Sequence, residues 1–184
     1  MSEEELVVLL DDDGREIGTA PKASVHGTDT ALHLAFSCHV LNDEGQVLVT
    51  RRALDKRTWP GVWSNSFCGH PAPAEPLLAA VRRRAEYEIG LAITDIELSL
   101  PLFRYRAVDA SGIVEHEICP VYTARAIGEP VLNPLEVAEA RWVAPEDLAR
   151  ALAATPWAFS PWLVLQAEQM RVFDALSPAG RGAP

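Results

Sequence analysis

The side chains best suited to chemistry are a pair of acids in a segment that the sequence predicts as a strand. Glu115 and Glu117 are two residues apart, so strand alternation places both carboxylates on one face and His116 on the other. Two acids on one face can bind a metal ion or act as acid and base, although solvated acids on an edge strand are the simpler alternative. The same alternation places Cys119 on that face, so it does not choose between Cys68 and Cys119 as a reactive thiol.

Cys68 stands between a segment with serine and asparagine, Ser64–Ser66, and the turn residues Gly69–Pro71. A thiol in such a place can face a ligand and react as the thiolate. A lone cysteine in an apolar stretch is more often an inert packing residue. Chemistry alone therefore leaves both roles open for Cys68.

The histidines add possible metal ligands to the two acids. We assign His39 to packing or to a hydrogen bond, and His116 to the opposite strand face. The other three histidines and the acids could provide five ligands of one metal ion, with a sixth position open. These five residues are His26, His33, His70, Glu115 and Glu117.

The spacing of Gly, Glu and Arg residues between positions 69 and 91 forms a longer pattern. It resembles the Nudix box, in which a strand, a loop and a helix present carboxylates to divalent cations that a diphosphate binds. The matching residues are Gly69, Glu75, Arg83, Ala85, Glu88, Gly90 and Leu91.

Two positions depart from that box, which has Glu where Arg84 and Tyr87 stand. A cation at Arg84 and a retained carboxylate at Glu88 suit the binding of a diphosphate better than the activation of water. The pattern therefore disfavours ordinary diphosphate hydrolysis. Arg84 and Glu88 are also four residues apart, the spacing of a plain surface ion pair on a helix.

Composition limits the class of protein. The 184 residues suit one domain, 1–184, and a formal net charge of -10 disfavours nucleic acid or an anionic membrane as a partner. A small anionic substrate stays compatible, because local Lys, Arg and metal ions bind it. Three scattered cysteines, no leader-like start and no bilayer-spanning apolar run predict a cytoplasmic protein. We expect a monomer or a weak homodimer.

Alternation, helical periodicity and turn residues predict a mixed α/β or α+β sandwich in a single domain. The predicted hairpin turns lie at Asn42–Gly45 and Asp109–Gly112, and Gly90 is placed to end a helix. We predict that the tail, 177–184, is disordered. The predicted strands are Leu6–Leu10, Leu32–Leu41, Gln46–Thr50, Leu100–Ala107 and Ile113–Ala126, and the predicted helices are Glu75–Ile89, Pro145–Ala153 and Pro161–Leu176.

Three long strings make the resemblance specific: RRALDKRTWPGVWSNSFCGHP at 51–71, FRYRAVDASGIVEHEICPVY at 103–122 and TPWAFSPW at 155–162. They resemble type I isopentenyl diphosphate isomerases, which have the Nudix fold and the same altered box. The likeness extends over roughly residues 6–176. It implies a Nudix-type mixed β-sheet sandwich flanked by helices.

This resemblance implies an enzyme of isoprenoid biosynthesis that converts isopentenyl diphosphate to dimethylallyl diphosphate. Cys68 and Glu117 would lie on opposite faces of the alkene, one giving a proton to C4 and the other removing one from C2. A tertiary carbocation would form at C3. Trp162 would stabilise that cation with its ring, and Tyr105 would act through Glu117.

The resemblance also implies two metal sites. One divalent ion, Mn²⁺, Mg²⁺ or Zn²⁺, would be held by the three histidines His26, His33 and His70 with Glu115 and Glu117. A Mg²⁺ ion would bridge the substrate diphosphate to Glu88. The diphosphate itself would be bound by four cationic side chains: Lys22, Arg52, Lys56 and Arg84.

Overall fold

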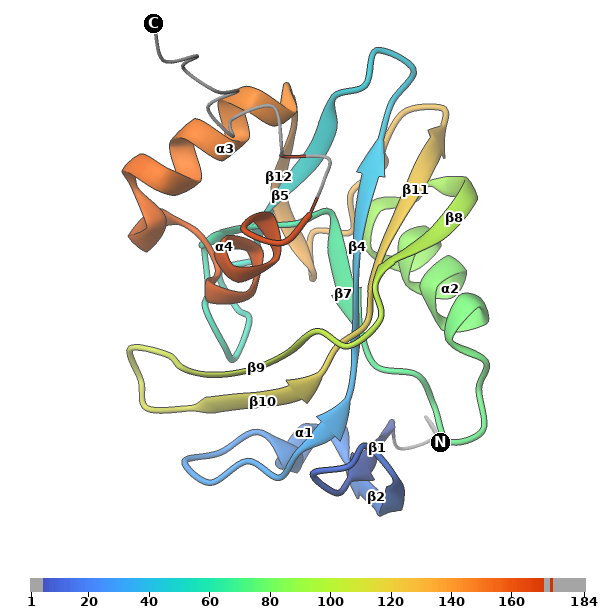
Figure 1. Ribbon diagram of the computed structural model, residues 1–184, viewed down its shortest axis with the longest axis vertical. Coiled ribbons are helices and arrows are strands. Elements are labelled where there is room, and N and C mark those ends of the chain that lie inside the picture. Colours follow the sequence, from blue (N-terminus) through green and yellow to red (C-terminus); the bar gives the residue numbers. More distant parts are fainter. Residues whose placement is uncertain (1–4, 171–172, 174–184) are drawn as a thin grey trace, which may run out of the picture.

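A computed structural model of the protein describes residues 5–170 and residue 173. The larger of its two sheets has seven strands (Figure 1). They are β4 (Phe36–Leu41), β5 (Val47–Arg52), β6 (Trp63–Ser64), β7 (Phe67–Gly69), β8 (Ala92–Leu100), β11 (Val121–Ile127) and β12 (Val137–Val143). The main path is β12-β5-β4-β11-β8, with β6 paired to β5 and β7 paired to β4.

The smaller sheet has five strands and lies at one end of the larger one (Figure 1). Its strands are β1 (Leu6–Leu10), β2 (Glu16–Pro21), β3 (His33–Leu34), β9 (Arg104–Val108) and β10 (Val114–Ile118). The order is β2-β1-β3-β10-β9, and β3 runs parallel to β10.

Helices cover both faces of the larger sheet, with α2 on one side and α3 and α4 on the other (Figure 1). Their bounds are α1 (Lys22–Val25), α2 (Leu77–Ile89), α3 (Pro145–Ala154) and α4 (Pro161–Ala167), with a 3₁₀ turn at Pro156–Ala158. No helix among residues 5–170 is long and apolar enough to cross a membrane. The two sheets and the helices that cover the larger one confirm the predicted α+β sandwich.

Strand alternation in β4 decides which side chains meet which helix. Phe36, Cys38 and Val40 are buried in the core cluster beneath α2. Ser37 and His39 point the other way, because both belong to a hydrogen-bond network with α4. Two polar side chains on the second face of the strand are thus fully buried.

The helix α2 ends where the sequence predicts. Its apolar side chains, among them Val81, Ala85 and Ile89, are buried against the sheet. Gly90 then adopts a left-handed conformation with φ of 60°, and its N–H donates to the last helical turn. The predicted β1, the hairpin of β4 and β5, and α3 are likewise confirmed.

The predicted strand Ile113–Ala126 is wrong, because the chain changes sheet within it. β10 ends at Ile118 in the smaller sheet, and β11 begins at Val121 in the larger one. Pro120 lies between them and has no N–H for a strand ladder, while the N–H of Cys119 donates to the carbonyl of Phe103 at 2.8 Å.

Other predicted boundaries also differ. The predicted strand Leu32–Leu41 divides into β3 and β4, which belong to different sheets. The strand predicted from Leu100 begins at Arg104, because Leu100 closes β8. The helix predicted over Pro161–Leu176 ends at Ala167, and the predicted disordered tail lies outside the described residues. The sequence patterns do not predict β2, α1, β6, β7, most of β8, or β12.

We expect Gly90→Ala to destabilise the protein by about 2–4 kcal/mol, because of its left-handed backbone and a clash. An added Cβ would lie 2.5 Å from the carbonyl oxygen of Val131. Gly112→Ala is the matched control, since its φ is also positive, 87°, but no atom lies within 4 Å of the added Cβ. Thermal and urea unfolding should show the larger loss for Gly90→Ala, and equal losses would contradict this reason.

Candidate active site

A cavity of about 530 Å³ brings the predicted site residues together, a volume in the usual range for small-ligand pockets. All of them except His33 line it. The lining residues from the predictions are Lys22, His26, Arg52, Lys56, Cys68, His70, Arg84, Glu88, Tyr105, Glu115, Glu117 and Trp162.

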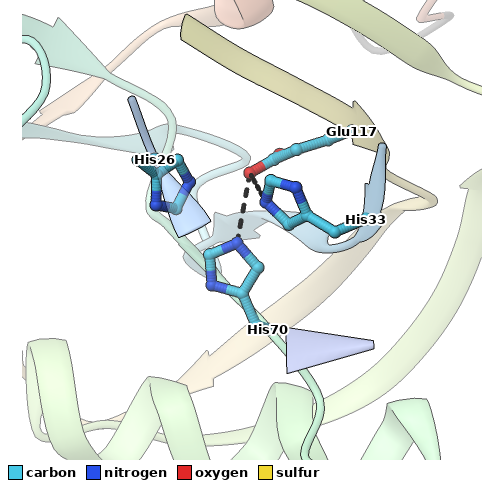
Figure 2. Close-up of side chains that lie close together, drawn as sticks. All are labelled: His26, His33, His70 and Glu117. Carbon is cyan, nitrogen blue, oxygen red and sulfur yellow. Dashed lines mark hydrogen bonds and ion pairs between the residues drawn. The ribbon is translucent and has the colours of Figure 1, made fainter. Parts of the chain in front are cut away.

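Three histidines and one glutamate form a compact group at one side of the cavity (Figure 2). The group is His26, His33, His70 and Glu117, and one potential ligand atom from each lies within 4.8 Å of the others. Strand pairing brings Glu117 next to His33 in this group. Glu117 on β10 lies opposite His33 on β3, and on its other side opposite Tyr105 on β9.

The polar atoms of this group fit a divalent cation. His33 Nδ1 donates to the carbonyl of Ala31 at 2.9 Å, which leaves the lone pair of Nε2 free. In the described part of the chain, the buried Nε2 atoms of His26 and His33 have no hydrogen-bond partner. Glu117 Oε1 lies 3.2 Å from His70 Nε2 and 3.5 Å from His33 Nε2. Unpaired buried nitrogen atoms around a carboxylate are a typical donor set for such an ion.

Burial lowers the pKa of His26 and His70, which favours the neutral, ligating imidazole. Burial also acts at His33, but there the Glu117 carboxylate outweighs it and raises the pKa. Burial and the neighbouring His70 and His33 lower the pKa of His26 to about 4, so its imidazole is neutral near pH 7. Burial raises the pKa of Glu117, but the neighbouring His33 and His70 outweigh it and hold that pKa well below its usual range. Glu117 is therefore a carboxylate.

Glu115, the fifth predicted ligand, lies outside the compact group of four. It accepts a hydrogen bond from Thr58 Oγ1 at 2.6 Å. The Tyr105 hydroxyl, which has a single proton to donate, lies 2.7 Å from Glu115 Oε2. The same hydroxyl lies 2.9 Å from Glu117 Oε2. Burial and the charge of Glu117 raise the pKa of Glu115, which makes it the more basic of the two carboxylates.

Cys68 presents its sulfur to the cavity from β7. Its Sγ lies 3.3 Å from Asn65 Oδ1 and 3.3 Å from Ser37 Oγ, and Ser37 is its partner across the strands. Burial raises the pKa of the thiol to about 12. Cys119 is also 3.3 Å from Ser37 Oγ, but it is buried and is not among the described residues that line the cavity. The position of the cavity therefore favours Cys68, a choice that alternation left open.

Trp162 forms an aromatic wall of the cavity from the first turn of α4. Its indole N–H donates to Asn65 Oδ1 at 2.9 Å, which fixes the plane of the ring. The rings of Trp59 and Tyr105 pack against it at centroid distances of 5.3 and 5.7 Å. The Arg52 guanidinium lies over the ring at 5.4 Å.

The four cationic side chains also face the cavity, and three of them are paired with acids. Lys22 pairs with Glu5, and Lys56 pairs with Glu136. Arg84 pairs with Glu88 on the same helix and lies 3.4 Å from Glu136. Burial lowers the pKa of Lys56 to about 8. Arg52 instead donates to the carbonyl oxygens of Thr58 and Trp59.

The sequence gives little or no sign of two contributors to the site, Glu136 and Asn65. Glu136 follows a loop with no helical or strand periodicity, so its pairing with Lys56 and Arg84 depends on the fold alone. Asn65 was noted only as a neighbour of Cys68, although it contacts both Cys68 and Trp162.

Comparisons with known proteins agree with this geometry. The NUDIX domain family matches residues 31–163. An isopentenyl-diphosphate Delta-isomerase of Agromyces mediolanus is 71% identical over 167 residues, which are 91% of this chain and 81% of the relative. One of Paenarthrobacter aurescens (strain TC1) is 58% identical and covers 100% of this chain and 99% of the relative.

Solved structures show the same fold. A crystal structure from Deinococcus radiodurans has a TM-score of 0.71 at 20% identity and covers 91% of this chain and 99% of its own. A MutT NUDIX hydrolase from Burkholderia pseudomallei has a TM-score of 0.57 at 27% identity and covers 75% of this chain and 97% of its own.

The fold and the helix α2 beside a cavity with acids and cations define a Nudix-domain protein. Within that class, the high identity over nearly the whole chain decides the family. The chain belongs to the isopentenyl-diphosphate Delta-isomerases.

We expect His26→Ala to lower the bound divalent metal per chain at least about tenfold, because it removes one nitrogen donor from the compact group. His116→Ala is the control, since its side chain lies on the opposite face of β10 from Glu117. Elemental analysis after dialysis against Mn²⁺, Mg²⁺ or Zn²⁺ measures the occupancy. Unchanged occupancy in His26→Ala would remove His26 from the ligand set.

Proposed function

We propose that the protein converts isopentenyl diphosphate to dimethylallyl diphosphate, with Cys68 and Glu117 as its acid/base pair. The observation that carries this proposal is the placement of a thiol and a carboxylate in one cavity that four cationic side chains also line. Relatives named for this activity support it at 58% and 71% identity.

The chemistry explains why two groups are needed. An alkene is a very weak base, so the site has to align an acid with C4 and a base with the hydrogen at C2. One group adds a proton to C4, and the alkene electron pair forms the new C–H bond, leaving a tertiary cation at C3. The other group removes a proton from C2, and that C–H electron pair forms the new double bond. One proton enters and one leaves, so the substrate and product have the same formula.

Trp162 and Tyr105 have supporting roles in this proposal. The indole ring of Trp162 forms a wall of the cavity and stabilises positive charge at C3 through its π electrons. The Tyr105 hydroxyl contacts Oε2 of Glu117, the oxygen that faces away from the histidines. Tyr105 thus orients the carboxylate for proton transfer.

The diphosphate binds to the cationic side chains of the cavity in this proposal. Lys22, Arg52, Lys56 and Arg84 all line the cavity, and charged N–H groups are strong donors to phosphate oxygen. Glu88 stands beside Arg84 on α2 and would share a Mg²⁺ ion with the substrate. Arg52 also donates hydrogen bonds to the carbonyls of Thr58 and Trp59, so it holds the loop that contains these two residues.

A divalent metal fits the group of His26, His33, His70 and Glu117, with Glu115 as the further ligand in this proposal. Such an ion supplies a positive charge that holds the Glu117 carboxylate in place. The identity of the metal stays a prediction from the sequence. The same is true of the oligomeric state, a monomer or weak homodimer, and of the cytoplasmic location.

One assay separates this function from that of a Nudix hydrolase. The purified protein is incubated with Mg²⁺ and isopentenyl diphosphate, and both dimethylallyl diphosphate and free phosphate are measured. We expect isomerisation without phosphate release, because Arg84 and Tyr87 stand where the hydrolase box has glutamates. Phosphate release without isomerisation would contradict the proposal.

We expect Cys68→Ala to lower kcat about 10²–10⁴-fold, the usual contribution of a positioned proton donor or acceptor. Diphosphate binding should be retained, because in this proposal the thiol acts on the reacting carbons and the cationic side chains bind the diphosphate. Cys119→Ala is the matched control and should keep kcat within about threefold, since Cys119 does not line the cavity among the described residues. Steady-state kinetics measure both, and an inactive Cys119→Ala beside an active Cys68→Ala would reverse the assignment.

We expect Glu88→Gln to raise the Mg²⁺ concentration needed for half-maximal activity at least about tenfold, because a carboxylate ligand is lost. The metal in the histidine group should stay bound, since Glu88 is not part of it. Glu86→Gln is the control on the same helix, where Glu86 is exposed. A Mg²⁺ requirement that is equal in the two variants would refute the role of Glu88.

A further inference from the structure

Two fully buried polar side chains on β4 have no part in the mechanism above. Ser37 and His39 are 0% exposed and face α4 amid an apolar cluster that contains Val121 and Leu163. A buried polar group is costly unless its hydrogen bonds are satisfied. The partner on α4 is Gln166, which is also fully buried.

The atom types in this network decide which group donates each hydrogen bond. Gln166 Oε1 lies 2.9 Å from His39 Nε2, and a carbonyl oxygen can only accept. Gln166 Nε2 lies 2.9 Å from Ser37 Oγ, and an amide nitrogen can only donate. His39 therefore donates to Gln166, and Gln166 donates to Ser37. The Ser37 hydroxyl proton is left to point at a sulfur atom.

Asn65 completes the surroundings of Cys68 from the other side. Its amide nitrogen donates to the carbonyls of Cys38 and Phe67 at 3.1 and 2.7 Å, so its oxygen is fixed toward Cys68. That oxygen accepts the thiol proton, while Ser37 offers a proton to the sulfur. The sulfur thus has one acceptor and one donor at 3.3 Å each.

We propose that Ser37 is a positioning residue for the isomerisation, and that Gln166 orients its hydroxyl toward the sulfur of Cys68. Ser37 is not among the described residues that line the cavity, so it acts through Cys68 and not on the substrate. As the neutral thiol gives its proton to C4 of the alkene, negative charge develops on the sulfur and the hydrogen bond from Ser37 strengthens. Cys119, the other sulfur within 3.3 Å, competes for that proton but carries no developing charge.

This inference rests on the proposed role of Cys68. The test compares Ser37→Ala with Ser66→Ala. Ser66 is also fully buried, and its hydroxyl contacts Val40 N and Leu48 O at 2.7 Å, away from both thiols. Both variants lose one buried hydroxyl and should lose similar thermal stability. We expect kcat to fall about 10- to 100-fold in Ser37→Ala, as for a lost hydrogen bond to a charged group, with KM changed less than about threefold. Ser66→Ala should keep kcat within about threefold.

Gln166→Met provides a second, independent variant that leaves the Ser37 hydroxyl in place. It should lower kcat by several-fold. The double variant Ser37→Ala with Gln166→Met should be no slower than Ser37→Ala alone, because Gln166 acts through the Ser37 hydroxyl. Multiplicative losses in the double variant, or wild-type kcat in Gln166→Met, would overturn the role of Gln166.

The outcomes separate this inference from the proposed function. Suppose that Cys68→Ala is inactive, as the proposed function requires. Wild-type kcat in Ser37→Ala, or an equal loss of kcat in Ser66→Ala, would then overturn the role of Ser37 alone. A fully active Cys68→Ala would instead overturn the proposed function itself.

Discussion

A buried carboxylate is the constraint on which the rest of the site depends. Glu117 is 5% exposed, and an unpaired charge at that depth would be strongly destabilising. Its two oxygens have different partners, because Oε1 faces His33 and His70 and Oε2 faces the Tyr105 hydroxyl. Strand register supplies two of these partners directly, since His33 and Tyr105 flank Glu117 on the neighbouring strands. Two strands of the smaller sheet, β3 and β9, therefore place partners of this one group.

The larger sheet supplies the opposing group. Cys68 lies on β7, and the adjacent Gly69 packs so closely on α2 that an added Cβ would lie 2.7 Å from Cγ of Arg84. This contact brings Arg84 of α2 next to β7, so a proposed diphosphate ligand and the proposed reacting thiol line one cavity. Because Asn65 contacts both Cys68 and Trp162, the acid/base group and the aromatic wall are held by one side chain.

The sequence predicted local features well and long-range ones less well. The end of α2 at Gly90 follows from local chemistry, and it is confirmed. The change of sheet at Cys119 and Pro120 was missed, because alternation continues across it while the hydrogen-bond partners change. The pairing of Glu136 with Lys56 spans 80 residues and leaves no local pattern. The family resemblance predicted one set of site residues, and all of them except His33 line the same cavity. Local rules alone left two thiols open.

The most direct test of proton transfer at Cys68 and Glu117 is turnover in D₂O. If one group adds a proton to C4 and the other removes one from C2, the added proton comes from a group that exchanges with water. The dimethylallyl diphosphate formed should then carry solvent deuterium in the methyl group derived from C4, as read by mass spectrometry and NMR. A product without deuterium would contradict the account and indicate internal transfer of the same proton.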